Sequence, residues 1–320
     1  MVKNLLKKNI LKFKKSKILC IGDIMLDEFI YGDVKRISPE APVPILLKDS
    51  YDRQIGGAGN VARNIASFGI NVGLLSIIGN DESSLYVDKL VRLEKKISPI
   101  FIKVKNYEMT KKTRFVNKSN QLLRVDSENT EFMNKLIEKK IMATFKKEVL
   151  KYNTVIISDY KKGMLNREII KKIVDFCIFK NIKILADPKS SDFSIYKNIQ
   201  VLTPNQKEFS EAVNCELHTV NQIVKEARKL IDNFNFDYII VTRSEEGMLL
   251  ISNNNVENIP TTAKDVFDVS GAGDTVISFI ALGFGAGLKM KHAVQIANHA
   301  AGIVVGKKGT AVTNRYEMMV

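Results

Sequence analysis

The sequence predicts an α/β protein whose central, mostly parallel sheet is covered by helices on both faces. Short runs of β-branched and apolar residues, typical of buried strands, recur along the chain. Segments with helical spacing of apolar residues lie between several of these runs. Strands that alternate with helices favour parallel pairing, because each connection has to cross a face of the sheet. With 320 residues, 45% of them hydrophobic, the chain can bury one large core, and we expect a single domain over residues 1–320.

The first strand is expected at residues 17–24, where an apolar run carries Gly22 and Asp23 near its end. This strand would deliver the Asp23 carboxylate at its C-terminal end. Further apolar runs predict strands at residues 72–78, 154–158, 182–186, 201–203 and 238–242. Helical spacing predicts helices at residues 58–68, 166–179, 219–231 and 272–282.

Two segments, residues 33–54 and 97–126, break this alternation. The first contains Pro39, Pro42 and Pro44, and the second alternates apolar with polar residues. Such alternation is typical of strands with one face open to solvent. We expect both segments to form a small β lid beside the main sheet, with a ligand bound between the lid and the strand ends.

The formal net charge is +14, from 49 basic and 35 acidic residues, yet 39 of the basic residues are Lys and only 10 are Arg. Because base recognition relies on Arg, we expect no nucleic-acid partner. Seven lysines lie within residues 1–17, an amphipathic segment with two open interpretations. It forms a terminal helix exposed to solvent, or a helix that touches a membrane or nucleic-acid surface.

The longest apolar stretches, residues 65–79 and 276–288, are too short to span a membrane. Cys20, Cys177 and Cys215 are far apart and lack the spacing of a metal site, so they are interpreted as reduced core residues. We therefore expect a soluble, cytoplasmic protein without a membrane partner.

The strongest chemical signal is residues 268–275, Asp-Val-Ser-Gly-Ala-Gly-Asp-Thr, before an apolar helical run. The small side chains of Gly271, Ala272 and Gly273 let a ligand approach the backbone, and the helix that follows directs free N–H groups at it. Asp274, in the first turn, could take a proton from a hydroxyl while the amides stabilise charge on a phosphoryl group. The alternative is a glycine-rich turn in which Asp274 only starts the helix.

A second glycine-rich segment, residues 56–60, Gly-Gly-Ala-Gly-Asn, opens the helix expected at residues 58–68. Its Asn60 can both donate hydrogen bonds to a polyol and accept them. Neither glycine segment contains the Gly-Lys-Ser/Thr of a Walker loop or follows the Gly-x-Gly-x-x-Gly dinucleotide fingerprint.

The pairing of residues 56–60 with residues 268–274 resembles the ribokinase/PfkB carbohydrate kinases, and the resemblance covers nearly the whole chain. It implies a ribokinase-like fold. Five more segments are similar to the D-glycero-β-D-manno-heptose-7-phosphate kinases of that family, and they are residues 22–27, 37–44, 121–126, 187–189 and 242–247.

The resemblance implies an ATP-dependent kinase that acts on a small-molecule sugar phosphate. It would phosphorylate the anomeric hydroxyl of heptose 7-phosphate to the 1,7-bisphosphate, on the route to ADP-heptose and the lipopolysaccharide core. Asp274 would be the base and residues 271–273 the anion hole. The sugar hydroxyls would be held by Asp23, Asp27, Gly57 and Asn60. Turn or helix-cap roles remain open for these four residues, above all for Asp27.

A sugar that already carries a phosphate needs cations, and the predicted lid contains Lys111, Lys112, Arg114 and Arg124. We expect Lys112, Arg114 and Arg124 to bind that phosphate. An exposed basic strand is the alternative, and it stays open for Lys111.

On the nucleotide side, Asn205 and Glu208 match the family's Asn-x-x-Glu element. They would organise Mg²⁺ and its waters around the phosphates of ATP, unless Asn205 only caps a helix. The resemblance places the remaining nucleotide contacts at Thr242, Ser244, Gly247 and Asn298.

Two other functions remain open. A PfkB kinase for another sugar or sugar phosphate would have the same base. A non-catalytic sugar or nucleotide sensor would not need Asp274, Asn205 or Glu208. Some relatives are fused to a nucleotidyltransferase marked by His-x-Gly-His, an element that this sequence lacks, so we expect a separate nucleotidyltransferase in the pathway. The resemblance and the exposed lid sheet favour a homodimer.

Overall fold

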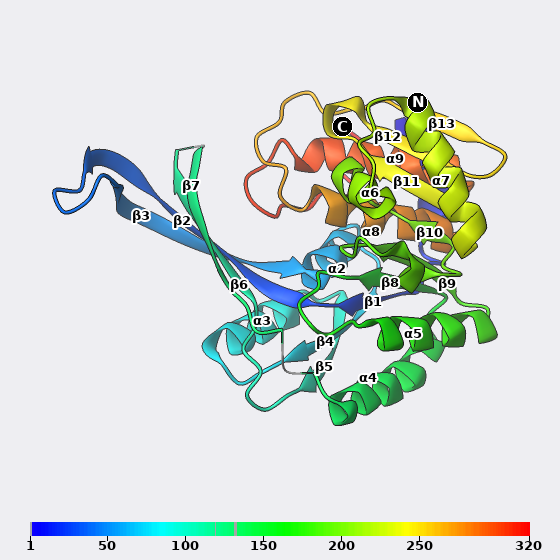
Figure 1. The fold of residues 1–320 in the computed structure, drawn as a ribbon, viewed down its shortest axis with the longest axis horizontal. Coiled ribbons are helices and arrows are strands. Elements are labelled where there is room, and N and C mark those ends of the chain that lie inside the picture. Colours follow the sequence, from blue (N-terminus) through cyan, green and yellow to red (C-terminus); the bar gives the residue numbers. More distant parts are fainter. Residues whose placement is uncertain (1, 119, 131–132) are drawn as a thin grey trace.

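The structure is a computed structural model that describes residues 2–118, 120–130 and 133–320, and it contains two sheets (Figure 1). The larger sheet has nine strands in the order β13-β12-β11-β10-β9-β8-β1-β4-β5. Its strands from β5 to β11 pair in parallel, and β12 and β13 are antiparallel. Their bounds are β1 Ile18–Gly22, β4 Val72–Ile78, β5 Ile97–Lys103, β8 Thr154–Ser158, β9 Lys183–Asp187, β10 Val201–Leu202, β11 Tyr238–Thr242, β12 Met248–Ile251 and β13 Val256–Ile259.

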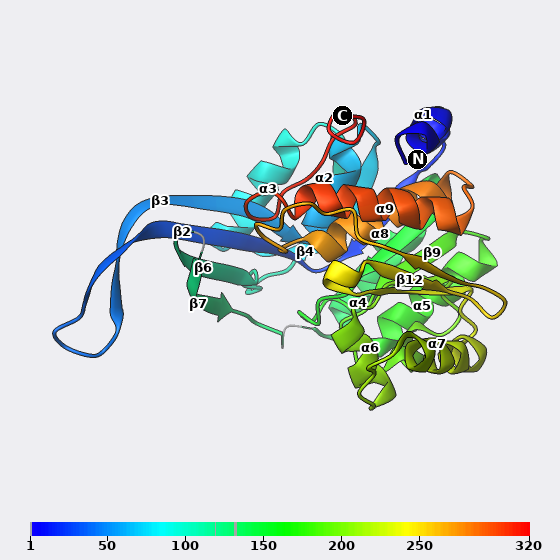
Figure 2. The same cartoon turned by 90° about the horizontal axis from the view of Figure 1, so that it is seen from above.

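Helices cover both faces of this sheet (Figure 2). Helices α2, α8 and α9 lie on one face with α1 packed outside them, while α5 and α7 lie on the other face with α4 against α5. The bounds are α1 Val2–Phe13, α2 Ala58–Ser67, α3 Glu82–Leu93, α4 Lys135–Glu148, α5 Arg167–Phe179, α6 Gln206–Val213, α7 Val220–Phe234, α8 Ala272–Gly285 and α9 Met290–Val304. Short 3₁₀ turns occupy Val149–Lys151, Phe193–Tyr196 and Ser244–Glu246.

The fold class is therefore confirmed. The strands predicted at residues 72–78, 154–158 and 238–242 have the observed bounds. Every residue of β1, β4 and β8 is buried, as expected for strands covered on both faces.

The smaller sheet is the lid, in the order β3-β2-β6-β7. Its strands are β2 Ile24–Ile37, β3 Pro44–Gly57, β6 Lys111–Asn117 and β7 Asn120–Ser127. The long β2–β3 hairpin projects away from the body of the molecule (Figures 1 and 2). Only Asp23 separates β1 from β2, so the two sheets are joined without a loop.

The predicted lid boundaries are wrong at two places. The lid begins at Ile24, not at residue 33, because β2 continues directly from the main sheet. Residues 97–103 form β5, which pairs in parallel with β4 at the edge of the main sheet. An edge strand with one packed face has the same alternating pattern as a lid strand, so the sequence pattern does not separate the two. Ser119, within the predicted segment, lies outside the described residues.

Helix α1 has an exposed lysine face and a buried apolar face. Leu6 and Phe13 are fully buried, and the Phe13 ring meets Phe68 edge-on at 5.4 Å between centroids. The interpretation of α1 as a purely solvated helix is thus wrong for its apolar face, which belongs to the core. No helix within the described part of the chain is both long and apolar enough to cross a membrane.

Two of the three cysteines are core residues as expected. Cys20 and Cys177 are buried, whereas Cys215 is exposed, which corrects the prediction for that residue. Cys215 directly follows Asn214, which ends α6 in a left-handed conformation at the surface.

Candidate active site

A cavity of about 640 Å³ lies where the N-terminus of α8 faces the ends of β9 and β11. It contains Lys189 and Tyr160, which the sequence analysis did not select. It also brings together all the residues predicted for the base, the anion hole and the nucleotide, namely Asn205, Glu208, Thr242, Ser244, Gly247, Gly271, Ala272, Gly273, Asp274 and Asn298.

The start of α8 forms a backbone cradle. Gly271 precedes the helix with φ 79°, a left-handed conformation that favours glycine, and no side chain caps the helix. A Cβ on Gly271 would lie 2.6 Å from Nδ2 of Asn60. A Cβ on Gly273 would meet no atom of the described residues within 4 Å, so space is left beside the first turn. The free N–H groups of that turn can therefore approach an anion.

Asp274 lies in this first turn and is 5% exposed. Asn60 donates from Nδ2 to Oδ2 of Asp274 at 2.7 Å, and the Tyr160 hydroxyl donates to Oδ1. Burial raises the pKa of Asp274 to about 7, although these two donors favour its charged form. A carboxylate with a pKa near neutrality is suited to general base catalysis.

Asn60 is fully buried beside the Asp274 carboxylate. Its Oδ1 has no hydrogen-bond partner within the described chain. Buried polar atoms are rarely left unpaired, so a ligand hydroxyl that donates to Oδ1 would satisfy it. This geometry supports the predicted contact between Asn60 and a polyol.

Lys189 supplies a cation to the cavity. Its Nζ lies 2.7 Å from Oε1 of Glu208 and 3.3 Å from Oδ2 of Asp187. Burial alone would lower the pKa of Lys189, but Asp187 and Glu208 raise it above its ordinary value, so the ammonium stays charged. Lys189 and Tyr160 each follow the end of a parallel strand by two residues. That position at adjacent strand ends is the signal that could have identified them.

Asn205 and Glu208 form a capping box at the start of α6. Oδ1 of Asn205 accepts from the Glu208 amide at 2.8 Å, and Oε2 of Glu208 accepts from the Asn205 amide at 2.9 Å. Desolvation, reinforced by Asp187, raises the pKa of Glu208. The cap role considered for Asn205 is therefore observed. Among the residues that the structure describes, no cluster of His, Cys, Asp or Glu could hold a metal ion by itself.

The far wall of the cavity is shaped by backbone turns. Ser244 and Gly247 have φ 49° and 83°, which turn the chain between β11 and β12. Asn298 is buried and donates from Nδ2 to the Pro260 carbonyl at 2.6 Å. Asn298 thus positions the segment after β13, and its contact with the nucleotide stays a prediction.

Asp23 has its own backbone partners. Its carboxylate accepts from the amides of Tyr160, Lys162 and Met164 at 3.3, 3.1 and 3.0 Å. Burial raises its pKa to about 6 against the opposing effect of these amides. With 2% exposure, Asp23 fixes the loop that carries Tyr160, and its contact with a sugar hydroxyl stays a prediction.

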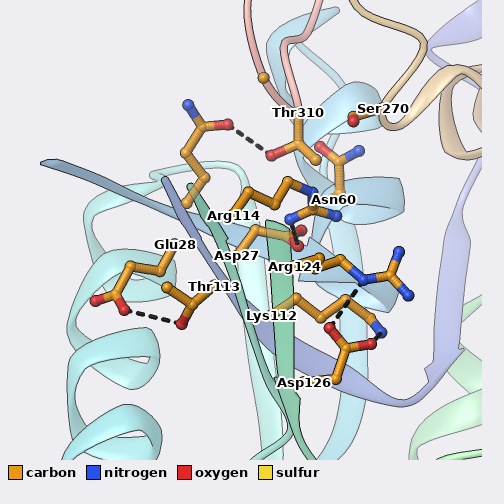
Figure 3. Close-up of polar contacts among 12 residues, drawn as sticks. Asp27, Glu28, Asn60, Lys112, Thr113, Arg114, Arg124, Asp126, Ser270 and Thr310 are labelled. Atoms are coloured by element: carbon orange, nitrogen blue, oxygen red, sulfur yellow. Dashed lines mark hydrogen bonds and ion pairs between the residues drawn. The ribbon is translucent and has the colours of Figure 1, made fainter. Parts of the chain in front are cut away.

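The remaining residues predicted for the sugar gather at the root of the lid, outside the large cavity (Figure 3). Gly57 has φ 59°, and a Cβ there would lie 2.3 Å from the Asp23 carbonyl oxygen. Arg114 donates from Nη1 to Oδ1 of Asp27 at 2.6 Å. Arg114 thus compensates the negative charge of the buried Asp27 by an ion pair.

Lys112 and Arg124 share one carboxylate. Nζ of Lys112 and Nε of Arg124 each lie 2.9 Å from an oxygen of Asp126 (Figure 3). Glu128 lies 3.5 Å from Lys112 as well. The structure therefore places these predicted phosphate ligands in ion pairs.

Residues 15–315 match the model of a protein family described as "pfkB family carbohydrate kinase". The chain belongs to this family. The pfkB chain is 38% identical over 310 residues to the bifunctional protein HldE of Paramagnetospirillum magneticum, covering 97% of this chain and 64% of the relative. It is 40% identical over 308 residues to HldE of Haemophilus influenzae, covering 96% and 63%. The chain thus spans less than two thirds of these relatives.

Solved pfkB-like structures show the same fold. Phosphofructokinase-2 from Escherichia coli, in complex with substrates and products, superposes with a TM-score of 0.80 at 18% identity, covering 95% of this chain and 97% of that one. Ribokinase from Thermotoga maritima gives 0.73 at 20% identity, covering 95% and 98%. The predicted ribokinase-like fold and the prediction of a carbohydrate kinase are confirmed.

Proposed function

We propose that this pfkB kinase transfers a phosphoryl group from ATP to the anomeric hydroxyl of D-glycero-β-D-manno-heptose 7-phosphate, giving the 1,7-bisphosphate. The observation that carries the proposal is Asp274, a buried carboxylate with a pKa near 7 at the N-terminus of α8. The similarity to HldE over nearly the whole chain supports a heptose phosphate as acceptor.

In this mechanism, Asp274 accepts the proton of the attacking hydroxyl. Asn60 and Tyr160 hold its two oxygens in place. The amides at the start of α8 and the ammonium of Lys189 stabilise the charge that develops on the transferred group. Asn60 and Tyr160 therefore assist the proton transfer, whereas the α8 amides and Lys189 stabilise the charge on the phosphoryl group.

The cavity fits a nucleotide. Its volume of about 640 Å³ is in the usual range for cofactor sites, and its floor is the backbone cradle of α8. The Asn205 and Glu208 side chains already bond within the chain, so Mg²⁺ would bind mainly to the phosphates and water, with Glu208 nearby. Bound there, Mg²⁺ would neutralise phosphate charge.

The wider setting forms part of the same proposal. The product would enter the route to ADP-heptose and the lipopolysaccharide core. We also place a homodimer contact on the lid, where Leu123 and Val125 of β7 are exposed.

The test is an acceptor panel with ATP and Mg²⁺, containing heptose 7-phosphate, the free heptose, sedoheptulose 7-phosphate, fructose 6-phosphate and ribose. Coupled ADP release gives kcat/KM for each, and ³¹P NMR identifies the phosphorylated carbon. We expect the highest kcat/KM for heptose 7-phosphate and a phosphate on C1. A higher value for any other acceptor would assign the enzyme to that sugar instead.

A further inference from the structure

A second cavity, of about 110 Å³, lies between the lid and the body of the molecule. Ser270 belongs to its wall, and the next residue, Gly271, belongs to the wall of the large cavity. The two cavities therefore lie on opposite sides of one loop. From the lid and the body, the small cavity is lined by Phe29, Tyr31, Arg114, Val116, Lys118, Gln121, Phe267, Asp268, Ser270 and Lys308.

The wall of this lid cavity has surplus positive charge. It contains Arg114, Lys118, Lys308 and one carboxylate, Asp268. Because Arg114 is already paired with Asp27, the two lysines supply the surplus. Both oxygens of Asp268 accept backbone N–H groups, from Ser270 at 2.9 Å and from Gly309 at 3.0 Å. Lys118 and Lys308 form no ion pair with any residue that the structure describes. Arg114 uses one guanidinium nitrogen for Asp27 and keeps further donors.

Two aromatic rings hold cations at this cavity without neutralising them. Phe29 and Tyr31 alternate along β2, and their rings stack at 6.1 Å with an interplanar angle of 6°. Nζ of Lys308 lies 3.3 Å from the Tyr31 centroid, and Cζ of Arg114 lies 5.1 Å from the Phe29 centroid. Cation–π contact fixes a cation in place but leaves its net charge intact.

The other cations of the lid differ in this respect. Lys112 and Arg124 both pair with Asp126, so a ligand phosphate would have to compete with a carboxylate already in contact (Figure 3). At the lid cavity, an incoming anion instead meets ammonium groups that lack a carboxylate partner. The free energy of binding a phosphate should therefore be more favourable at the lid cavity than at Asp126.

We propose that the lid cavity is the subsite for the phosphate that the sugar already carries, with Lys308, Lys118 and Arg114 as its cations. The inference rests on the proposed function, because it requires a phosphorylated acceptor. The sugar ring would lie along the loop from Ser270 to Asp274. In this position its reacting hydroxyl faces the base while its phosphomonoester dianion is held under the lid.

The test compares Lys308→Ala and Lys118→Ala with Lys48→Ala, using heptose 7-phosphate and the free heptose as acceptors. Lys48 is a matched control, because it is an exposed lid lysine whose Nζ lies 4.5 Å from the Tyr51 centroid, outside the cavity. We expect Lys308→Ala to raise the KM for heptose 7-phosphate about 10- to 100-fold, as for loss of a charged hydrogen bond. In Lys308→Ala, the KM for ATP and the kcat/KM for free heptose should be unchanged. Lys48→Ala should keep the wild-type KM for heptose 7-phosphate, and Lys308→Arg should restore that KM.

The outcomes separate this inference from the proposed function. If wild-type enzyme uses heptose 7-phosphate and the Lys308 and Lys118 variants keep its KM within about twofold, the lid cavity is not the subsite and the function stands. If wild-type enzyme rejects heptose 7-phosphate but uses another sugar phosphate in a Lys308-dependent way, the function is wrong and the subsite stands. A wild-type preference for unphosphorylated sugars overturns the subsite.

Discussion

Replacing Asp274 by Asn removes the proton acceptor while keeping the size of the side chain. A positioned general base contributes about 10²–10⁴-fold to rate, and we expect kcat to fall by that factor. The KM values for ATP and sugar should change little, because the α8 amides and Lys189 are untouched. Steady-state ADP release measures kcat, calorimetry measures ATP binding, and Asp175→Asn on the exposed face of α5 serves as control.

The pH dependence gives a second measure of the same residue. Because burial raises the pKa of Asp274 to about 7, kcat/KM of the wild-type enzyme should rise with pH and level off above that value. This rise should be absent in Asp274→Asn. A folded Asp274→Asn variant with near-wild-type kcat would refute the assignment of the base.

Stability should change in the opposite direction to activity. The pKa of Asp274 in the folded protein, about 7, exceeds its ordinary value of 3.8, so its contribution to stability is full below pH 3.8 and is lost as pH rises through 7. The difference of about three pKa units corresponds to at most about 4 kcal/mol. Asn carries no charge, so the Asp274→Asn variant does not lose this stability as pH rises. Its gain over wild type at high pH is only partial, because Asn has one acceptor oxygen for the two donors Asn60 and Tyr160. The Tm of Asp274→Asn relative to wild type should therefore be higher at pH 8 than at pH 5, and an equal difference at both would contradict the buried charge.

Two further predictions concern residues outside the glycine-rich motifs. Tyr160→Phe removes a hydroxyl that lowers the pKa of Asp274, so the rise of kcat/KM should move to higher pH, and an unmoved profile would show that this hydrogen bond is unimportant. Phe13→Ala should lower the free energy of unfolding by about 3–5 kcal/mol, because the ring is fully buried, while kcat of the folded enzyme stays the same. Thermal unfolding compares this variant with Lys12→Ala on the exposed face of α1, and equal Tm values for the two would show that α1 does not contribute to the core.

The sequence predicted the central strands and the glycine-rich helix starts because their signals are local. Residues 154–158 form a fully buried strand, so the apolar run itself gives the bounds. Residues 97–103 were assigned to the wrong sheet because an edge strand and a lid strand have the same alternation. The glycine of residue 271 is required by its own backbone conformation, which a sequence motif can reveal.

The missed parts of the site depend on contacts between distant segments. Tyr160 reaches Asp274 because α8 packs against β8, and Lys189 reaches Glu208 because β9 pairs with β10, the strand before α6. The pairing of Lys112 with Asp126 follows from the register between β6 and β7, in which these residues are partners. No local pattern encodes that register, so the cations appeared free in the sequence.

Because a single residue joins the two sheets, the chain at the root of the lid cannot lengthen or shift without moving both sheets. Asp23 joins β1 to β2, and its carboxylate holds the loop of Tyr160, whose hydroxyl donates to Asp274. An insertion at this junction would shift the loop and the glycine turn at Gly57 together. Within the described residues, the distal turn at residues 38–43 has no such connection to Asp274. The length of the β2–β3 hairpin can therefore vary at its tip while the contacts at its root stay unchanged.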